Sequence, residues 1–309
     1  MTSKAVVFNE FGGADVLSVQ EVEVPAPGPG QVRIAVRTAG VNPLDVKIRA
    51  GYMREVFPVE LPHVPGVEAA GVVESVGEGV TSVAVGDEVF GPTLTGSYAE
   101  QALAVADKLA RKPASLGWEQ ATALPIAAET TYRALELLDL RAGETLLVHG
   151  AAGGVGTVAV QFAVGRGLKV IGTASDANHE HLRALGVIPV RYGDGLADRV
   201  REVAPDGVDA ALDLAGHGDE LAVSVELTGG KERVVTIANP VGAAEHGVTF
   251  TGGGPGTTRE AAGFAEALSL LAAGKLELPV HQAFPLAEAA DAHRASEAGH
   301  LTGKLVLVV

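Results

Sequence analysis

Residues 145–162, TLLVHGAAGGVGTVAVQF, constrain the fold of this chain more than any other stretch. A short apolar run ends at His149, glycines follow at once, and an apolar segment with helical spacing comes next. A strand, a glycine-rich turn and a helix in this order direct free backbone N–H groups toward an anion, which predicts a pyrophosphate site. The alternative is an ordinary strand–turn–helix built from small residues.

Two glycines of this turn have different predicted tasks. Gly153 lets the backbone pass close to the phosphates, whereas Gly156 lets the new helix pack against the strand. Ala151 stands where the usual fingerprint has its first glycine. The expected cofactor contacts in the turn are Ala152, Gly153, Gly154, Val155 and Gly156.

Composition limits the class of protein. The chain has 309 residues, of which 47% are hydrophobic, enough for two domains with real cores. Its 38 acidic residues outnumber 23 Lys and Arg, and the net charge of −15 repels nucleic acid and anionic membranes. An anionic cofactor must therefore be held by local dipoles and a few local cations.

The chain contains no cysteine, which excludes disulfides and thiolate metal sites. Its first residues lack the long apolar core of a signal peptide, and no run is long and apolar enough to span a bilayer. We therefore expect a cytoplasmic protein without a membrane or nucleic-acid partner.

The hydrophobic pattern changes near Trp118. Before it, short Val-rich runs are separated by Pro, Gly and Asp, which predicts an antiparallel, barrel-like domain. Directly after it, two segments have helical spacing. The expected strands of the first part are residues 4–8, 31–38, 69–75 and 88–90, and the two helices are residues 119–128 and 130–138.

From residue 146 onward, strand-like and helix-like segments alternate, which predicts a parallel sheet with helices on both faces. The tail returns to strand-like pieces at 280–284 and 304–309, which are expected to rejoin the first domain. The alternating strands are expected at 146–149, 169–173, 187–191, 208–212 and 231–237, and the helices at 155–164, 178–185, 196–203, 220–227 and 259–273.

Four motifs together resemble the zinc-free quinone oxidoreductase (zeta-crystallin-like) branch of the medium-chain dehydrogenase/reductase family. They are AGVNPLD at 39–45, PGVEAAG at 65–71 followed by VGDEV at 85–89, HGAAGGVG at 149–156, and HLTGKLVL at 300–307. The resemblance covers almost the whole chain. It implies a GroES-like, β-rich barrel domain (1–120 and 275–309), a doubly wound Rossmann domain (121–274), and catalysis in the cleft between them.

The same resemblance bears on metal binding. Zinc-containing relatives have a Cys where Asn42 stands and a His where Val67 stands, and Val67 cannot ligate a metal. We therefore expect no metal, and Glu68 is predicted to be structural. Without a Lewis acid, the hydride acceptor must already be electrophilic, as a quinone or an enone is.

Three residues are candidate catalytic groups. The Asn42 amide is expected near the nicotinamide or its ribose, where it can donate to a developing enolate; Asn42-Pro43 is otherwise a turn. Asp45 either orders the loop at 42–52 or joins a proton relay. Tyr52 either orients a carbonyl or serves as an aromatic wall.

The end of the second Rossmann strand selects the cofactor. Ser175 can donate to a 2′-phosphate, which favours NADPH over NADH. Asp176 would repel that phosphate unless it is the N-cap of the next helix, which is how we interpret it. The side chains expected around the phosphate are His179, Arg183, Arg191 and Tyr192.

Four other positions carry expected cofactor contacts. Thr130 is expected to bond a ribose hydroxyl or phosphate at a helix start, with a simple N-cap as the alternative. Ala215 is expected on the adenine side, and the backbone at Ile237 near the carboxamide. Lys304 either reaches the cofactor phosphates or is a solvated strand residue. The glycine run at 251–256 is a loop beside the cofactor or on the surface.

These expectations describe an NADPH-dependent, metal-free reductase of quinones or α,β-unsaturated carbonyls. One alternative is an enoyl reductase that tailors a biosynthetic intermediate. Others are a non-catalytic NADPH-binding sensor or partner protein, and a structural protein that kept the site for stability. The resemblance also implies a homodimer through edge strands near 234–237 and 248–251.

Overall fold

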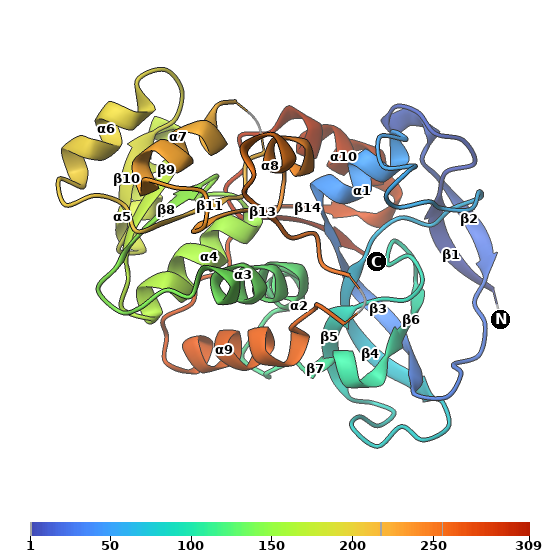
Figure 1. Cartoon of the computed structure of the whole chain (residues 1–309). Helices are drawn as coiled ribbons and strands as arrows, with labels where there is room; N and C mark the ends of the chain where they lie inside the picture. The colour runs from blue at the N-terminus through green and yellow to red at the C-terminus, as the bar shows by residue number, and fades with distance from the viewer. Residues whose placement is uncertain (1, 217, 255) are drawn as a thin grey trace. The chain divides into compact units, whose positions relative to one another are not determined.

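The computed structural model describes residues 2–216, 218–254 and 256–309. The chain separates into two compact units, which we call unit 1 (residues 1–126 and 279–309) and unit 2 (residues 127–278). Figure 1 labels their helices and strands along the chain. No helix in the described ranges is both long and apolar enough to cross a membrane.

Unit 1 is built on a seven-stranded, mostly antiparallel sheet in the order β14-β15-β3-β4-β5-β7, with β6 also paired to β3. Val32, Ile34 and Val36 alternate with less buried residues along β3, so one face of the sheet forms the core. The strands are β3 (Gln31–Val41), β4 (Glu68–Val76), β5 (Glu88–Pro92), β6 (Gln101–Val105), β7 (Ala110–Arg111), β14 (Val280–Pro285) and β15 (Lys304–Val308).

The GroES-like expectation for this unit is confirmed, but the sheet is open: its described strands do not close into a barrel. A separate antiparallel pair consists of β1 (Thr2–Val7) and β2 (Ser18–Glu23). The helices of unit 1 are α1 (Pro43–Arg49), α2 (Trp118–Thr122) and α10 (Ala289–Ala298), and α10 packs against α1.

Unit 2 has a six-stranded parallel sheet in the order β10-β9-β8-β11-β12-β13, the doubly wound arrangement that the sequence predicts. Its central strands are buried and consist mainly of Val, Ile, Leu and Ala. The strands are β8 (Thr145–His149), β9 (Lys169–Ala174), β10 (Ile188–Arg191), β11 (Ala210–Asp213), β12 (Val234–Thr236) and β13 (Thr249–Phe250).

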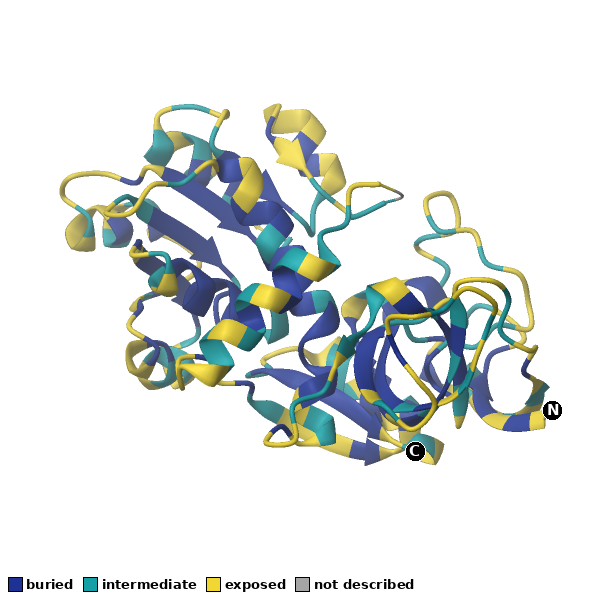
Figure 2. Cartoon of the chain, turned by 90° about the horizontal axis from the view of Figure 1, so that it is seen from below, coloured by how far each residue is buried: buried dark blue, intermediate teal, exposed yellow. Residues whose placement is uncertain are grey.

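Helices cover both faces of this sheet, and in Figure 2 their outward faces are exposed while the strands are buried. One layer contains α6, α7 and α8, which pack Leu196, Val200, Leu221 and Ala243 onto the strands. The other contains α4 and α9, and Gly263 of α9 lies against the α3 backbone. The helices are α3 (Pro125–Leu138), α4 (Gly154–Gly165), α5 (His179–Ala184), α6 (Leu196–Val203), α7 (Glu220–Thr228), α8 (Pro240–His246) and α9 (Glu260–Ala272).

Several predicted boundaries are wrong. The helical segment after Trp118 breaks at residues 123–124, between α2 and α3, and not at Glu129. The strand near 234–237 is not a sheet edge, because β12 pairs with β11 on one side and β13 on the other. Only β13 of the two predicted segments lies at the edge. In the predicted loop at 251–256, Pro255 lies outside the described residues.

Candidate functional site

The glycine-rich turn of unit 2 joins β8 to α4. Gly150 leaves the strand with a φ of 71°, a left-handed conformation that favours glycine, and Gly153 is the N-cap of α4. A Cβ on Gly156 would lie 2.1 Å from the Gly150 carbonyl oxygen, so the helix can pack here only on glycine. A Cβ on Gly153 would meet its nearest neighbour at 3.5 Å. Gly156 therefore serves the protein's own packing, whereas Gly153 leaves open space at the helix start.

This turn fits a diphosphate. The first bond inside α4 runs from the Thr157 N–H to the Gly153 carbonyl at 2.8 Å, so the N–H groups of residues 154–156 precede it. Such N–H groups, together with the helix dipole, attract an anion. Ala152, the residue before the N-cap, is buried. The structure thus brings together all five residues of the turn that the sequence predicts as cofactor contacts.

Buried side chains that the sequence analysis missed support the turn from below. The Gly150 N–H donates to Thr173 Oγ1 at 3.3 Å, and this hydroxyl lies 3.4 Å from His149 Nδ1. His149 Nε2 lies 2.9 Å from Ser224 Oγ. Burial lowers the pKa of His149 to about 4, against the opposing effect of Asp213, so the imidazole is neutral at neutral pH. The only sequence signal for His149 and Thr173 is that each is the last residue of a predicted strand.

The interpretation of Asp176 as an N-cap is wrong. Ser175 is the N-cap of a short 3₁₀ helix over Asp176–Asn178, and Asp176 is its first residue. The Asp176 carboxylate instead pairs with Arg191 at 3.2 Å and lies 3.8 Å from His179 Nε2. Arg191 therefore offsets the negative charge beside Ser175.

A second arginine shapes the loop that carries Tyr192. Arg199 of α6 donates to the carbonyl oxygens of Arg191, Tyr192, Gly193 and Asp194. Five guanidinium N–H groups in a rigid fork suit such a run of carbonyl groups. The Tyr192 side chain is 41% exposed, and Arg183 is exposed as well. Nothing in the local sequence pattern distinguishes Arg199 from Arg201, the other arginine of α6.

The remaining predicted contacts of unit 2 lie at strand ends and in α3. Thr130 is buried inside α3, so it is not the N-cap of a helix. Asp213, the last residue of β11, accepts from the Ala215 N–H at 2.9 Å through its side chain. Its carbonyl accepts from the Ile237 N–H at 3.1 Å. Asp213 thus fixes both turns in which Ala215 and Ile237 follow their strands.

Unit 1 contains a buried polar cluster formed by Asn42, Glu68 and Lys304. Asn42 Nδ2 donates to Glu68 Oε1 at 2.8 Å, and Lys304 Nζ donates to Asn42 Oδ1 and Glu68 Oε1 at 2.5 and 2.6 Å. All three residues are at most 7% exposed, so the alternative of a solvated Lys304 is wrong. Glu68 also accepts from the Ile126 N–H at 2.8 Å. The neighbouring strands β15 and β4, and the start of α1 directly after β3, bring these residues together.

Asp45 lies beside this cluster in the first turn of α1. Its Oδ2 accepts from the Asn42 N–H at 2.8 Å and from the Tyr98 hydroxyl at 3.2 Å. Tyr98 also lies 3.2 Å from His293 Nε2 of α10. Burial raises the pKa of Asp45 to about 7. Asp45 therefore both orders the start of the 42–52 segment and belongs to a buried hydrogen-bonded chain.

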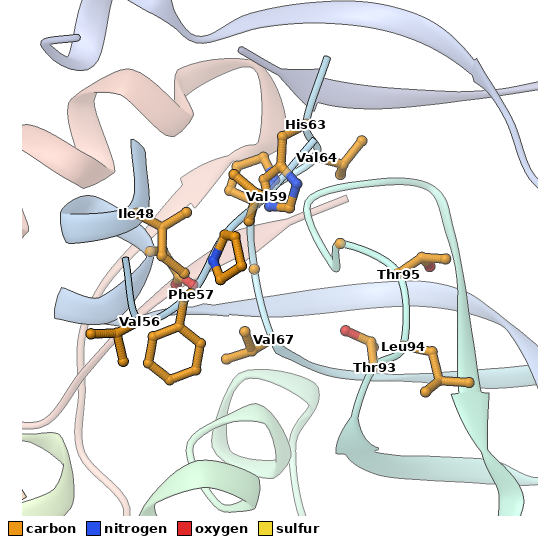
Figure 3. A pocket seen from close by; sticks show the side chains of 15 residues that line it. Ile48, Val56, Phe57, Val59, His63, Val64, Val67, Thr93, Leu94 and Thr95 are labelled. Carbon is orange, nitrogen blue, oxygen red and sulfur yellow. The ribbon is translucent and has the colours of Figure 1, made fainter. Parts of the chain in front are cut away.

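A cavity of about 280 Å³ opens next to Asp45 (Figure 3). Its walls are mainly apolar, with Ile48, Phe57 and Val67 among them, and His63 is a further titratable residue on its lining. Tyr52 is not among the lining residues and is 82% exposed. The structure thus gathers two of the three predicted catalytic residues and leaves Tyr52 at the surface of unit 1. The remaining lining residues are Val56, Pro58, Val59, Val64, Pro65, Gly66, Thr93, Leu94, Thr95 and Gly96.

The ligand set for a metal is lacking in the described part of the chain. No group of three or more His, Cys, Asp or Glu side chains is arranged there to hold an ion. Glu68, which borders the position of Val67, is already bound to Lys304 and Asn42.

Comparisons with known proteins agree with this geometry. A family model described as an alcohol dehydrogenase GroES-like domain matches residues 28–118, and one described as a zinc-binding dehydrogenase matches residues 184–307. A quinone oxidoreductase of Mus musculus is 34% identical over 330 aligned positions, and the alignment covers 99% of this chain and 98% of that protein. The chain belongs to the quinone oxidoreductase type of the medium-chain dehydrogenase/reductase family.

Two further relatives define the range of this similarity. The structure of Escherichia coli quinone oxidoreductase complexed with NADPH superposes with a TM-score of 0.88 at 28% identity, covering 99% of this chain and 100% of that one. The pikromycin polyketide synthase component PikAII of Streptomyces venezuelae is 39% identical over 94% of this chain, which is 8% of that protein. The family resemblance and the combination of a GroES-like with a Rossmann fold are thereby confirmed.

Proposed function

We propose that this oxidoreductase uses NADPH, without a metal, to transfer hydride to quinones or α,β-unsaturated carbonyls. The observation that carries the proposal is the turn at 150–156, where Gly156 packs on the Gly150 carbonyl and leaves the first N–H groups of α4 for a diphosphate. Two relatives support it, the quinone oxidoreductase of Mus musculus and the Escherichia coli quinone oxidoreductase complexed with NADPH.

Reduced nicotinamide, when bound, supplies the hydride, and the protein's own groups bind and orient. Residues 152–156 would hold the diphosphate, while Thr173 and His149 keep Gly150 in place beneath it. Ser175 would donate to the 2′-phosphate, and Arg191 would offset the charge of Asp176. The apolar cavity beside Asp45 would exclude water from the acceptor.

Two measurements test this function. Isothermal titration of the purified chain with NADPH and with NADH should show binding, tighter for NADPH. Adding para-benzoquinone, or an enone, should then oxidise the bound NADPH. The loss of NADPH absorbance measures this oxidation. If NADPH binds but a broad acceptor panel gives no oxidation above background, the chain is a cofactor-binding sensor or partner. If neither cofactor binds, the dinucleotide site itself is refuted.

A second candidate is an enoyl reductase that tailors a biosynthetic intermediate. It is favoured by the similarity to PikAII, a component of a polyketide synthase. The two candidates differ in the acceptor, because an enoyl reductase acts on a thioester. Comparing kcat/KM for para-benzoquinone, cyclohexenone and crotonyl thioesters decides between them, and a strong preference for the thioester would replace our first proposal.

We also propose that the chain acts as a cytoplasmic homodimer whose subunits meet at β13. The edge position of this strand and the 41% exposed ring of Phe250 on it support the interface. Light scattering should give twice the chain mass, and Phe250→Lys should lower it. A monomer at micromolar concentration would contradict the proposal.

A further inference from the structure

Two residues on the lining of the unit 1 cavity each have one buried polar atom without a hydrogen-bond partner in the described part of the chain. The atoms are Asp45 Oδ1 and Thr93 Oγ1. Buried side-chain oxygens are nearly always paired, so an unpaired one calls for an explanation. Two of them on the lining of one cavity point to a ligand that supplies the missing partner.

The rest of the lining suits a small, largely apolar molecule. Ile48, Phe57 and Val67 contribute hydrocarbon or ring surface, and about 280 Å³ of space admits a small ring compound. In Figure 3 the Thr93 hydroxyl points toward Val67 and away from Leu94. A ring that carries an oxygen atom would satisfy both the apolar walls and the two unpaired groups.

The position of Asp45 determines which hydrogen-bonding role its free oxygen can take. Its Oδ2 already accepts two hydrogen bonds, from Asn42 and Tyr98. Burial and the Glu68 carboxylate favour the protonated acid, whereas Lys304 and the two hydrogen bonds favour the carboxylate, with burial the largest effect. A proton on Asp45 therefore resides on Oδ1, because Oδ2 is occupied as an acceptor.

Other charged or titratable groups surround this carboxyl. His293 contacts the far side of Tyr98, and its pKa is lowered to about 3 by burial and by Arg49, so it stays neutral. His63 lines the same cavity, and burial lowers its pKa as well. Arg49 is buried and paired with Glu297 of α10. None of these neighbours adds a titration that mimics ionisation of Asp45 near neutral pH.

We propose that this cavity binds the carbonyl oxygen of the hydride acceptor, held by the protonated carboxyl of Asp45 and the hydroxyl of Thr93, and that Asp45 delivers the proton that completes the reduction. The proposal rests on the proposed function, because it names the acceptor site and the acid for that reaction.

The step balances. The reduced nicotinamide loses a hydride, which adds to carbon and brings both electrons. The O–H bond at Asp45 Oδ1 breaks, and a new O–H bond forms on the acceptor oxygen. A quinone then becomes a keto tautomer of the hydroquinone, which rearranges when a proton leaves the ring carbon and another is taken up by the second oxygen; an enone becomes an enol that rearranges to the saturated ketone. Asp45 is left as the carboxylate and regains a proton from water after the product leaves.

The first test measures binding without cofactor or turnover. Cyclohexenone and its oxygen-free analogue cyclohexene are titrated into the protein between roughly pH 5 and pH 9, a range that brackets the titration. Cyclohexenone should bind about tenfold more weakly at the alkaline end, where Asp45 becomes a carboxylate that repels the carbonyl oxygen. Cyclohexene binding should not depend on pH. Cyclohexenone binding that is equally strong at both ends would overturn the proposal.

Two variants distinguish the contribution of Asp45 to cyclohexenone binding from that of Thr93. Thr93→Val removes only the hydroxyl and should weaken cyclohexenone about fivefold at every pH. Asp45→Asn keeps an N–H donor toward the cavity but cannot titrate, so its cyclohexenone affinity should be independent of pH. Thr81→Val and Asp206→Asn, both at exposed positions, are the matched controls and should behave as wild type. Should Asp45→Asn fail to fold, Thr93→Val still decides the question.

Turnover provides the second readout. With para-benzoquinone, wild-type kcat should fall as pH rises through about 7, the value to which burial raises the pKa of Asp45. In Asp45→Asn, kcat should be about a hundredfold lower and independent of pH, while the Kd for NADPH stays unchanged. A loss of NADPH binding in the wild type would refute the proposed function instead. Normal NADPH binding with unaltered kcat in Asp45→Asn would refute only the role of Asp45.

Discussion

The two candidate sites use opposite means to hold charge. In unit 2, the turn at 150–156 presents backbone N–H groups, and its side chains are reduced to hydrogen or methyl at nearly every position. In unit 1, the cluster of Asn42, Glu68 and Lys304 consists of side chains that come from two strands and a helix N-cap. A backbone site therefore depends on the absence of bulky side chains that would cover its N–H groups. A side-chain site depends on the presence of every hydrogen-bonding partner.

The largest effect is expected from breaking the buried ion pair. Lys304→Met leaves the Glu68 carboxylate buried without its cation, which should lower the free energy of unfolding by about 4 kcal/mol. Urea denaturation followed by circular dichroism measures this loss. The double variant Lys304→Met/Glu68→Gln removes both charges and should recover more than half of it. If the double variant is no more stable than the single one, the pair is not what stabilises the cluster.

The next effect concerns the glycines of unit 2. Gly156→Ala places a methyl group 2.1 Å from the Gly150 oxygen, so α4 must shift and stability should fall by about 3 kcal/mol. Gly153→Ala meets nothing closer than 3.5 Å and should cost less than about 1 kcal/mol. Thermal unfolding compares the two. Equal losses would show that the turn does not pack as described.

Gly153 should nevertheless matter for binding. Gly153→Val puts a branched side chain at the helix start, where the diphosphate would lie, and should weaken NADPH by at least about a hundredfold, or ~3 kcal/mol, with the fold retained. Fluorescence titration gives the affinity, and circular dichroism checks the fold. Unchanged affinity would place the cofactor elsewhere.

The free energy of unfolding at low pH offers another comparison of the two units, because each unit buries a neutral histidine. The pKa of His149 falls from 6.5 in the unfolded chain to about 4 in the folded one. Below pH 6.5 the unfolded chain binds the proton first, so the stability present above that pH is lost on acidification toward pH 4. His149→Gln should remove about 3 kcal/mol of this pH dependence. If the free energy of unfolding changes with pH by the same slope in wild type and variant, the prediction is contradicted. His293→Gln is the corresponding variant in unit 1.

The smallest effect is on cofactor choice. Ser175→Asp adds a carboxylate next to Asp176, and Arg191 cannot offset both charges. NADPH binding should weaken about tenfold, or ~1.4 kcal/mol, whereas NADH binding should change little. Paired titrations with the two cofactors measure the difference. If both weaken equally, Ser175 does not contact the 2′-position.

The sequence predicted what is local. Strand, glycines and helix follow one another within residues 145–162, and the alternation after residue 146 predicts the parallel sheet without any knowledge of long-range contacts. The polar cluster has no such signal, because Asn42 and Lys304 are 262 positions apart. For the same reason, neither the Tyr98–His293 contact nor the cavity beside Asp45 could be found from spacing.

The alternative given for Asn42-Pro43, a turn, is wrong for a specific reason. The pair begins α1, with Asn as N-cap and Pro in the first turn. Asn239-Pro240 begins α8 in the same way, and there Asn239 accepts from the Gly242 N–H at 2.8 Å. Proline has no N–H to lose at a helix start, so Asn-Pro signals a helix as well as a turn. Helix α10 was missed because the tail was interpreted only as strands.

The pairing of β15 with β3 affects the order in which the two units can fold during synthesis. Unit 2 is one continuous segment, residues 127–278, whereas unit 1 needs residues 279–309 to complete its sheet. During synthesis on the ribosome, unit 2 can therefore fold before unit 1, although unit 1 contains the N-terminal residues. Until Lys304 is synthesised, Glu68 has no cation beside it, so the N-terminal segment depends on late residues to become native.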